Sequence, residues 1–169
     1  MNFTSYADYF TGNEDEQAIT YLALANTLIH ELKPKAVSVA EEMSGYPGLC
    51  APVPGGGVGF DFRLSMGVPD FWIKMVKDIP DEVWSMGHIY HELTQHRAEE
   101  KTISYAESHD QALVGDKTII FRLIDKEMYF YMSKLTPNMV VDRGIALHKM
   151  IRLLTLATNS WRVPQFYGQ

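Results

Sequence analysis

Ala36-Val37-Ser38-Val39-Ala40-Glu41-Glu42 is the stretch of the sequence that decides the fold class. Its first five residues are small or β-branched, as is typical of a buried strand, and the two glutamates close the apolar run. Pro34 separates this run from a preceding helical pattern, so that a helix leads almost directly into a strand. That order is typical of an α/β protein, and it places carboxylates at the C-terminal end of the strand.

The helix before this strand has both a start signal and a stop signal. Asn13 can cap its free amide groups, Glu16 lies three residues later as a capping box requires, and Pro34 ends the pattern. The apolar residues recur at intervals of three and four, which predicts one buried stripe. They are Ala18, Tyr21, Leu22, Ala25, Leu28, Ile29 and Leu32.

Strand and helix patterns alternate further along the chain. Residues 58–62 and 102–106 are predicted strands. Residues 70–77 and 81–97 are predicted helices, and a last helix contains the apolar positions of residues 145–156. Three strands that alternate with helices favour a parallel sheet.

Polar side chains follow the first and the third predicted strand. Glu41 and Glu42 follow the first, and Glu107-Ser108-His109-Asp110-Gln111 follows the third. The C-terminal strand ends of parallel α/β folds meet around one site, so Glu41 or Glu42 and Asp110 are the acids of interest. Two such carboxyls can perform glycoside chemistry, in which one protonates the leaving oxygen and the other attacks or stabilises the sugar cation. From spacing alone, an equally good interpretation is that the glutamates begin a solvated helix and that Asp110 caps another.

Length and composition limit the classes of function. The 169 residues favour one domain and fall short of a complete (β/α)8 barrel, which needs about 250. Fifteen Lys and Arg against 21 Asp and Glu leave a net charge of −6, which argues against a nucleic-acid partner. No secretory signal and no run of about 18 apolar residues is visible, so we expect no membrane contact and a cytoplasmic location. Cys50 is the only cysteine, so the chain can form no internal disulfide.

A long, ordered set of motifs resembles one enzyme family. The motifs are Ala40–Cys50, Gly59–Leu64, Tyr105–Thr118, Phe121–Asp125 and Asp142–Leu153. They resemble the 1,4-α-glucan (glycogen or starch) branching enzymes, members of glycoside hydrolase family 13, and the similarity extends from near Phe3 to about Leu156. The resemblance implies an α/β fold, namely an incomplete (β/α)8 TIM barrel that covers roughly strands five to seven with their helices. Residues 1–156 would form this partial catalytic domain, and residues 157–169 would be a divergent or truncated tail.

The resemblance also implies a reaction and the residues that perform it. Such enzymes are retaining glucanotransferases, which cleave an α-1,4-glucan and transfer the released segment to a 6-hydroxyl to form an α-1,6 branch. The family's general acid/base falls on Glu41, its transition-state-stabilising aspartate on Asp110 and its substrate-contacting histidine on His109. The expected partner is an α-1,4-glucan (glycogen, amylose or amylopectin), and neither a metal nor an organic cofactor is expected. In a plant or an alga, a plastid is the alternative location.

The sequence departs from the family in two places that bear on activity: one would precede Met1, and the other follows Leu156, where the family continues into its eighth strand. The family's nucleophilic aspartate lies in a Gly-Phe-Arg-Phe-Asp segment that would precede Met1. Gly59-Phe60-Asp61-Phe62-Arg63 looks similar but matches the family's sixth strand, so Asp61 is not expected to be the nucleophile. The resemblance therefore implies a fragment that is inactive alone. The alternatives are a non-catalytic glucan-binding fragment, or one that docks a complementary barrel fragment, and a family 13 hydrolase or debranching enzyme.

Several other polar residues are interpreted as structural. Glu42 and Glu107 are assigned to support rather than to catalysis, and His148 to a packed or hydrogen-bonded position in the last helix. Four further histidines share no metal-ligand spacing and are interpreted as surface or capping residues. They are His30, His88, His91 and His96.

Overall fold

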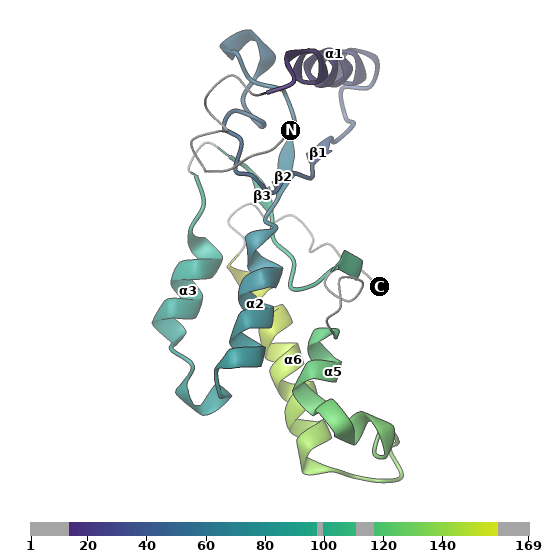
Figure 1. Ribbon diagram of the computed structural model, residues 1–169. Coiled ribbons are helices and arrows are strands. Elements are labelled where there is room, and N and C mark those ends of the chain that lie inside the picture. The colour runs from purple at the N-terminus through teal and green to yellow at the C-terminus, as the bar shows by residue number, and fades with distance from the viewer. Residues whose placement is uncertain (1–13, 98–99, 111–116, 159–169) are drawn as a thin grey trace. The chain divides into compact units, whose positions relative to one another are not determined.

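The computed structural model describes residues 14–97, 100–110 and 117–158, and it confirms the α/β class. In this part of the chain, three short strands form one sheet and five α-helices accompany them (Figure 1). The chain folds as two compact units, Met1–Leu64 with His96–Thr102 and Ser65–Gln95 with Ile103–Gln169. None of the described helices is both long and apolar enough to cross a membrane. Most of the predicted tail, residues 159–169, lies outside the described residues.

The three strands run parallel in the order β1-β2-β3. They are β1 (Val39–Ala40), β2 (Phe62–Leu64) and β3 (Thr102–Ile103). The pairing of β1 with β2 is parallel. Arg63 N donates to Lys101 O (2.9 Å) and Ser65 N to Ile103 O (3.0 Å), so successive bonds advance by two residues in the same direction on both chains. This is the pattern of a parallel ladder. The observed β1 and β3 lie within the strands predicted over residues 36–40 and 102–106, but both are shorter than predicted.

The strand predicted over 58–62 is displaced along the sequence. Gly59 has a φ of +81°, in the left-handed region, and its amide donates to Ala51 O (3.0 Å). The chain turns there, which a glycine does at little steric cost, and it becomes extended only from Phe62. The displacement places Arg63 inside the strand instead of after it.

The first helix, α1 (Glu16–Leu32), has the predicted end but a different cap. The carboxylate of Asp15 accepts the amides of Gln17 (3.1 Å) and Ala18 (3.0 Å). Asn13, the predicted cap, lies outside the described residues. Asp15 directly precedes the first helical residue, and an N-cap side chain reaches the second and third amides from that position.

The buried stripe predicted on α1 is wrong, because most of its large apolar residues are exposed. Tyr21 is 71% exposed and Leu32 73%. The helix packs through an adjacent face instead, where Ile19 and Ala23 contact the small core of the first unit. Asn26 is buried on that face, and its side-chain amide donates to Val58 O (2.9 Å). The buried face of α1 therefore includes a polar residue, Asn26, whereas the periodicity predicted a face of apolar residues alone.

The second unit is mainly helical. Its helices are α2 (Gly67–Asp78), α3 (Met86–Thr94), α5 (Ile119–Ile124) and α6 (Met139–Ala157), and α5 lies against α6 (Figure 1). The buried core residues come from all four helices and from the segment after β3: Val68, Trp72, Met75, Ile89, Leu93, Ala106, Ile119 and Ile151. Trp72 is fully buried, and its indole N–H donates to Thr155 Oγ1 (2.8 Å). The core therefore contains a satisfied polar group at its centre.

The helix predicted over 81–97 is broken in two. A 3-10 turn, Asp81–Val83, is followed by extended backbone at Trp84, and Ser85 then caps α3 by accepting the amide of His88 (3.3 Å). A serine competes for helix amides with its hydroxyl, so it starts a new helix instead of continuing the old one. Neither α5 nor the 3-10 segment Asp125–Tyr129 was predicted, and α6 begins before its predicted apolar positions.

Candidate active site

Glu41 occupies the position that the sequence predicts for it. It directly follows β1, so it lies at the C-terminal end of that strand, and it is exposed to solvent. In parallel α/β proteins this edge of the sheet is the one that carries binding and catalytic groups. Glu41 is therefore accessible to a ligand at the correct edge of the sheet.

Glu42 points into the protein and closes the loop that follows. Its carboxylate accepts the amides of Ser44, Gly45 (3.1 Å) and Tyr46 (3.1 Å), and it forms an ion pair with Arg63 Nη2. Burial raises the pKa of Glu42, but these hydrogen bonds and the guanidinium outweigh burial and lower the pKa below its ordinary value. Glu42 is thus a partly exposed carboxylate (27%) whose oxygens are occupied by amide and guanidinium partners, in agreement with its structural interpretation.

Asp110 and His109 lie together in the second unit, at the start of the helical residues that follow the segment after β3. His109 Nε2 is 3.1 Å from Asp110 Oδ1, and the side chains are 60% and 42% exposed. The hydroxyl of Ser108 donates to Asp110 Oδ2 (3.2 Å) and accepts the amide of Asp110 (3.2 Å). The two residues that the sequence assigns to one substrate are therefore neighbours on an open surface.

Glu107 is the buried counterpart of this pair. Its carboxylate accepts the amide of Ile119 (2.8 Å) and Nη2 of Arg152 (2.6 Å), and His148 Nε2 lies 3.3 Å from it. His148 Nε2 also lies 3.0 Å from Arg152 Nε, and since a ring nitrogen carries either a proton or a lone pair, it serves one partner at a time. Burial raises the pKa of Glu107, but the hydrogen bonds and the Arg152 charge outweigh burial and lower it. The structural interpretation of both Glu107 and His148 agrees with these contacts.

Glu41 belongs to the first unit and Asp110 to the second. Each lies after a strand of the same three-stranded sheet. Their approach to one substrate remains a prediction from the parallel arrangement of the strands.

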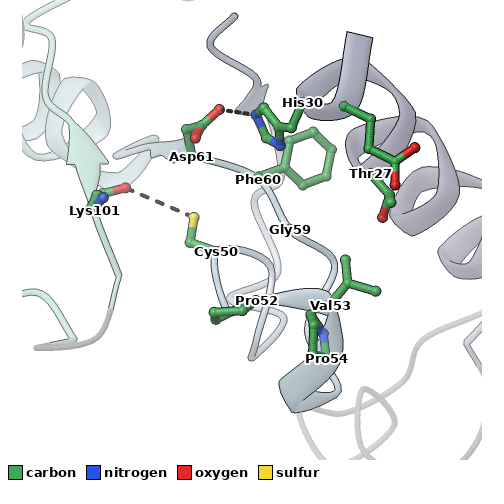
Figure 2. Close-up of a pocket in the computed structure, with 11 residues that line it drawn as sticks. Thr27, His30, Cys50, Pro52, Val53, Pro54, Gly59, Phe60, Asp61 and Lys101 are labelled. Atoms are coloured by element: carbon green, nitrogen blue, oxygen red, sulfur yellow. Dashed lines mark hydrogen bonds and ion pairs between the residues drawn. The ribbon is translucent and has the colours of Figure 1, made fainter. Parts of the chain in front are cut away.

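Figure 2 shows a separate cavity, of about 500 Å3, that lies at the N-terminal ends of β2 and β3. It is lined by Asp61 and Lys101, which directly precede β2 and β3, and by residues of α1 and of the loop around Cys50. Asp61 Oδ2 accepts the amide of Ser38 (2.8 Å) and lies 2.9 Å from His30 Nε2. Asp61 is therefore a bound structural group at the N-terminal strand edge, consistent with its exclusion as nucleophile. His30 lies in the last turn of α1 with its side chain 32% exposed, and its contact with Asp61 was not predicted from the sequence.

The thiol of Cys50 at this cavity is not prepared for chemistry. Burial and the nearby carboxylate of Glu100 raise its pKa to about 11, so that it stays protonated at neutral pH. Among residues 14–97, 100–110 and 117–158, no group of three or more His, Cys, Asp and Glu side chains is arranged to hold a metal ion.

Comparison with known proteins assigns the family. The chain is 58% identical over 151 residues, 89% of its length, to a 1,4-alpha-glucan-branching enzyme of Rhizophagus irregularis. It is 55% identical over 164 residues to the enzyme of that name from Felis catus and 56% identical over 165 residues to that from Dictyostelium discoideum. The chain belongs to the 1,4-α-glucan-branching enzyme family. No family model matches it.

The chain spans between 22% and 24% of the length of these branching enzymes. The similarity covers 96% of the chain in the Felis catus comparison, so both the Glu41 segment and the Asp110 segment lie within branching-enzyme sequence.

Three residues of this branching-enzyme segment were not singled out from the sequence. Arg63, Glu100 and Arg97 form a chain of ion pairs beside the loop after Glu41. Arg63 lies in the Gly59–Leu64 motif, but the strand was predicted over residues 58–62, which left Arg63 outside the sheet. A charged residue within a strand of a buried sheet was the available signal, because such a group must find partners when the sheet forms.

Proposed function

We propose that this chain supplies the general acid/base and the transition-state-stabilising aspartate of a branching enzyme that acts on α-1,4-glucans. The observation that carries the proposal is the accessible Glu41, at the C-terminal end of β1, within sequence 55% identical to a branching enzyme. The reaction would cleave an α-1,4 bond with retention and form an α-1,6 branch in glycogen or starch. The related proteins are named as branching enzymes, which supports a transferase over a family 13 hydrolase or debranching enzyme.

The proposed first step breaks the glycosidic bond. Glu41 donates its proton to the leaving 4-oxygen while a carboxylate nucleophile, which is not assigned within this chain, attacks the anomeric carbon. Asp110 stabilises the positive charge that develops on the sugar ring, and His109 donates a hydrogen bond to a sugar hydroxyl. In the second step the 6-oxygen of the acceptor displaces the nucleophile from the anomeric carbon. Glu41, now a carboxylate, takes the proton of this 6-hydroxyl and is thereby protonated again.

We further propose that the chain forms strands five to seven of a (β/α)8 barrel of glycoside hydrolase family 13. Three parallel strands in sequence order, with α2 and α3 between β2 and β3 and with candidate residues after the first and third strand, support this assignment. An exposed apolar surface on α1 is also what a partial barrel would leave. The cytoplasmic location and the independence from metal and organic cofactors stay predictions.

The decisive experiment is a chimaera in which this chain replaces the matching 151-residue segment of the Rhizophagus irregularis enzyme. We expect the chimaera to introduce α-1,6 linkages into amylose, measured by debranching and chain-length analysis. Glu41→Gln in the chimaera should reduce the rate by about 100- to 10,000-fold, the usual contribution of a general acid/base.

Glu42→Gln is the matched control, because it makes the same chemical change one residue away. It should reduce the rate less than Glu41→Gln. The reverse order of the two variants would show that the wrong glutamate has been assigned. Release of reducing sugar without new branches would instead show a hydrolase.

A further inference from the structure

Arg63 connects the loop that follows Glu41 to the neighbouring strand. It lies on β2 opposite Ala40, the residue directly before Glu41, and it is only 7% exposed. Its Nη2 donates to the main-chain carbonyl of Glu42 (3.3 Å) and pairs with the carboxylate of the same residue. Its Nη1 donates to the carbonyl of Tyr46 (3.2 Å). One guanidinium therefore holds both ends of the loop 42–46.

The loop is closed from within as well. The carboxylate of Glu42 accepts three consecutive amides, those of Ser44, Gly45 and Tyr46. Gly45 has a φ of +80°, in the region that favours glycine, which lets the chain bend back to the carboxylate. Glu42 and Arg63 thus supply most of the hydrogen bonds that fix the backbone on the C-terminal side of Glu41.

A second acid, Glu100, orients the guanidinium of Arg63. Glu100 is 5% exposed, and its two oxygens lie 3.2 and 3.4 Å from Arg63 Nη1. Arg97 Nη1 donates to the same carboxylate (3.3 Å), and Arg97 Nη2 donates to Gly45 O (2.8 Å). Two glutamates and two arginines therefore balance their charges around one loop, which reduces the cost of burying them.

We propose that Arg63, oriented by Glu100, is a positioning residue that holds Glu41 in place for proton transfer to the glucan. The proposal rests on the assignment of Glu41 as the general acid/base. Glu41 is exposed, so the direction of its side chain depends on the backbone between β1 and the closed loop. General acid catalysis needs hydrogen-bond distance to the leaving oxygen, and a displacement of about 1 Å can cost roughly 100-fold in rate.

An arginine suits this position better than a lysine. The planar guanidinium donates in several fixed directions and reaches the Glu42 carbonyl, the Tyr46 carbonyl and two carboxylates at once. A lysine ammonium keeps the charge but cannot bridge both ends of the loop. Arg63→Lys should therefore retain the fold and lose part of the positioning.

The test compares two donors in the chimaera described above. Amylose needs a proton on its leaving sugar oxygen, whereas an α-maltooligosyl fluoride releases fluoride without one. Arg63→Met should lower kcat on amylose by roughly 100-fold with KM nearly unchanged, and first-turnover fluoride release by less than about threefold. Arg63→Lys should lie between Arg63→Met and the parent. Arg143→Met, which removes an exposed arginine paired with Asp81 and Glu82, should leave both donors unaffected.

Each outcome decides between positioning and a merely structural role. Equal losses on amylose and on the fluoride would overturn the proposal, since a general defect does not depend on the leaving group. If Arg63→Met does not fold, Arg63→Lys and Glu100→Gln carry the same comparison. If the chimaera stays active after Glu41→Gln, the proposed function itself is overturned. That result does not depend on the comparison of amylose with the fluoride.

A second measurement uses the 169-residue chain alone. Hydrogen exchange should show the amides of Ser44, Gly45 and Tyr46 protected in the parent and exchanging at least about tenfold faster in Arg63→Met. The amides of α6 should keep their rates in this variant. Unchanged exchange in the loop would contradict the claim that Arg63 holds it.

Discussion

At the scale of the residue, each candidate catalytic group lies within three residues of an ion-paired glutamate that is less exposed than itself. Glu41 precedes Glu42, which is held by Arg63, and His109 with Asp110 follows Glu107, which is held by Arg152. An exposed side chain can reach a substrate but has little to hold it in place, whereas a buried carboxylate with charged and amide partners is rigid. The pairing combines access and rigidity within two or three consecutive residues.

The buried glutamate Glu107 should make stability depend on pH. Its pKa is lowered below the ordinary value of 4.5, so the unfolded chain binds the proton at a higher pH than the folded chain does. The stabilisation that ionised Glu107 gives the folded state is present above about pH 4.5. It is lost as the pH falls through the pKa of Glu107 in the folded state. We expect the free energy of unfolding, measured in urea, to fall between about pH 6 and pH 3.

Glu107→Gln tests the origin of this fall. The variant should be less stable at pH 6, because the amide cannot pair with Arg152 as an anion does, and its stability should change less between pH 6 and pH 3. Glu14→Gln is the control, since that residue lies outside the Arg152 and His148 contacts. An identical pH slope in the parent and in Glu107→Gln would contradict the assignment.

At the scale of the element, α5 and α6 pack so closely that a glycine is required between them. A Cβ at Gly144 on α6 would overlap the γ2 methyl of Ile124 on α5. Gly87 on α3 is also helical, but a Cβ there meets nothing closer than Ser85 Oγ at 3.9 Å. Alanine substitutions at Gly144 and at Gly87 therefore differ in whether the new methyl group meets a packed side chain.

Gly144→Ala should be less stable than Gly87→Ala by about 1 to 3 kcal/mol, the usual cost of overpacking a core. Gly144 lies inside α6, where alanine gains about 1 kcal/mol of helix propensity, whereas Gly87 lies in the first turn of α3, where the gain is smaller. The difference between the variants is therefore a lower bound on the cost of the contact with Ile124. Thermal unfolding followed by circular dichroism measures it. Equal melting temperatures would show that α5 moves aside without cost.

At the scale of the whole molecule, α1 carries one of two groups of exposed large apolar residues in the described part of the chain, and the other lies in residues 129–140. Leu24, Leu28 and Leu32 are 65%, 55% and 73% exposed and follow one another at intervals of four residues, so they share one side of the helix. Contiguous apolar surface of this kind favours association. We expect the isolated chain to self-associate as its concentration rises, or to bind a complementary barrel fragment.

Replacement of Leu24 and Leu28 by lysine should shift the chain toward the monomer in light scattering after size exclusion. The double variant Leu135→Lys with Leu153→Lys adds the same charge at two other exposed positions and should shift it less. A parent chain that stays monomeric at all concentrations would contradict the prediction.

The sequence predicted the elements of the fold better than their edges or their buried faces. The strand before Glu41 and the end of α1 at Pro34 are local features, marked by β-branched residues and by a ring that cannot continue a helix. The displaced β2 depends on the turn at Gly59, and the break before α3 depends on Ser85; both involve hydrogen bonds that several alternatives would also satisfy. The buried face of α1 depends on what lies beside it.

For the candidate site, the sequence by itself predicted the candidate residues and determined at which end of the strands Glu41 lies, because strand direction and motif order are properties of the chain. Only the tertiary structure decided how these residues are held. Arg63 meets Glu42 and Glu100 across 21 and 37 residues of sequence, and Arg152 meets Glu107 across 45. The partner of a buried charge is chosen when distant segments come together, since only then does the loss of water make a particular pairing necessary.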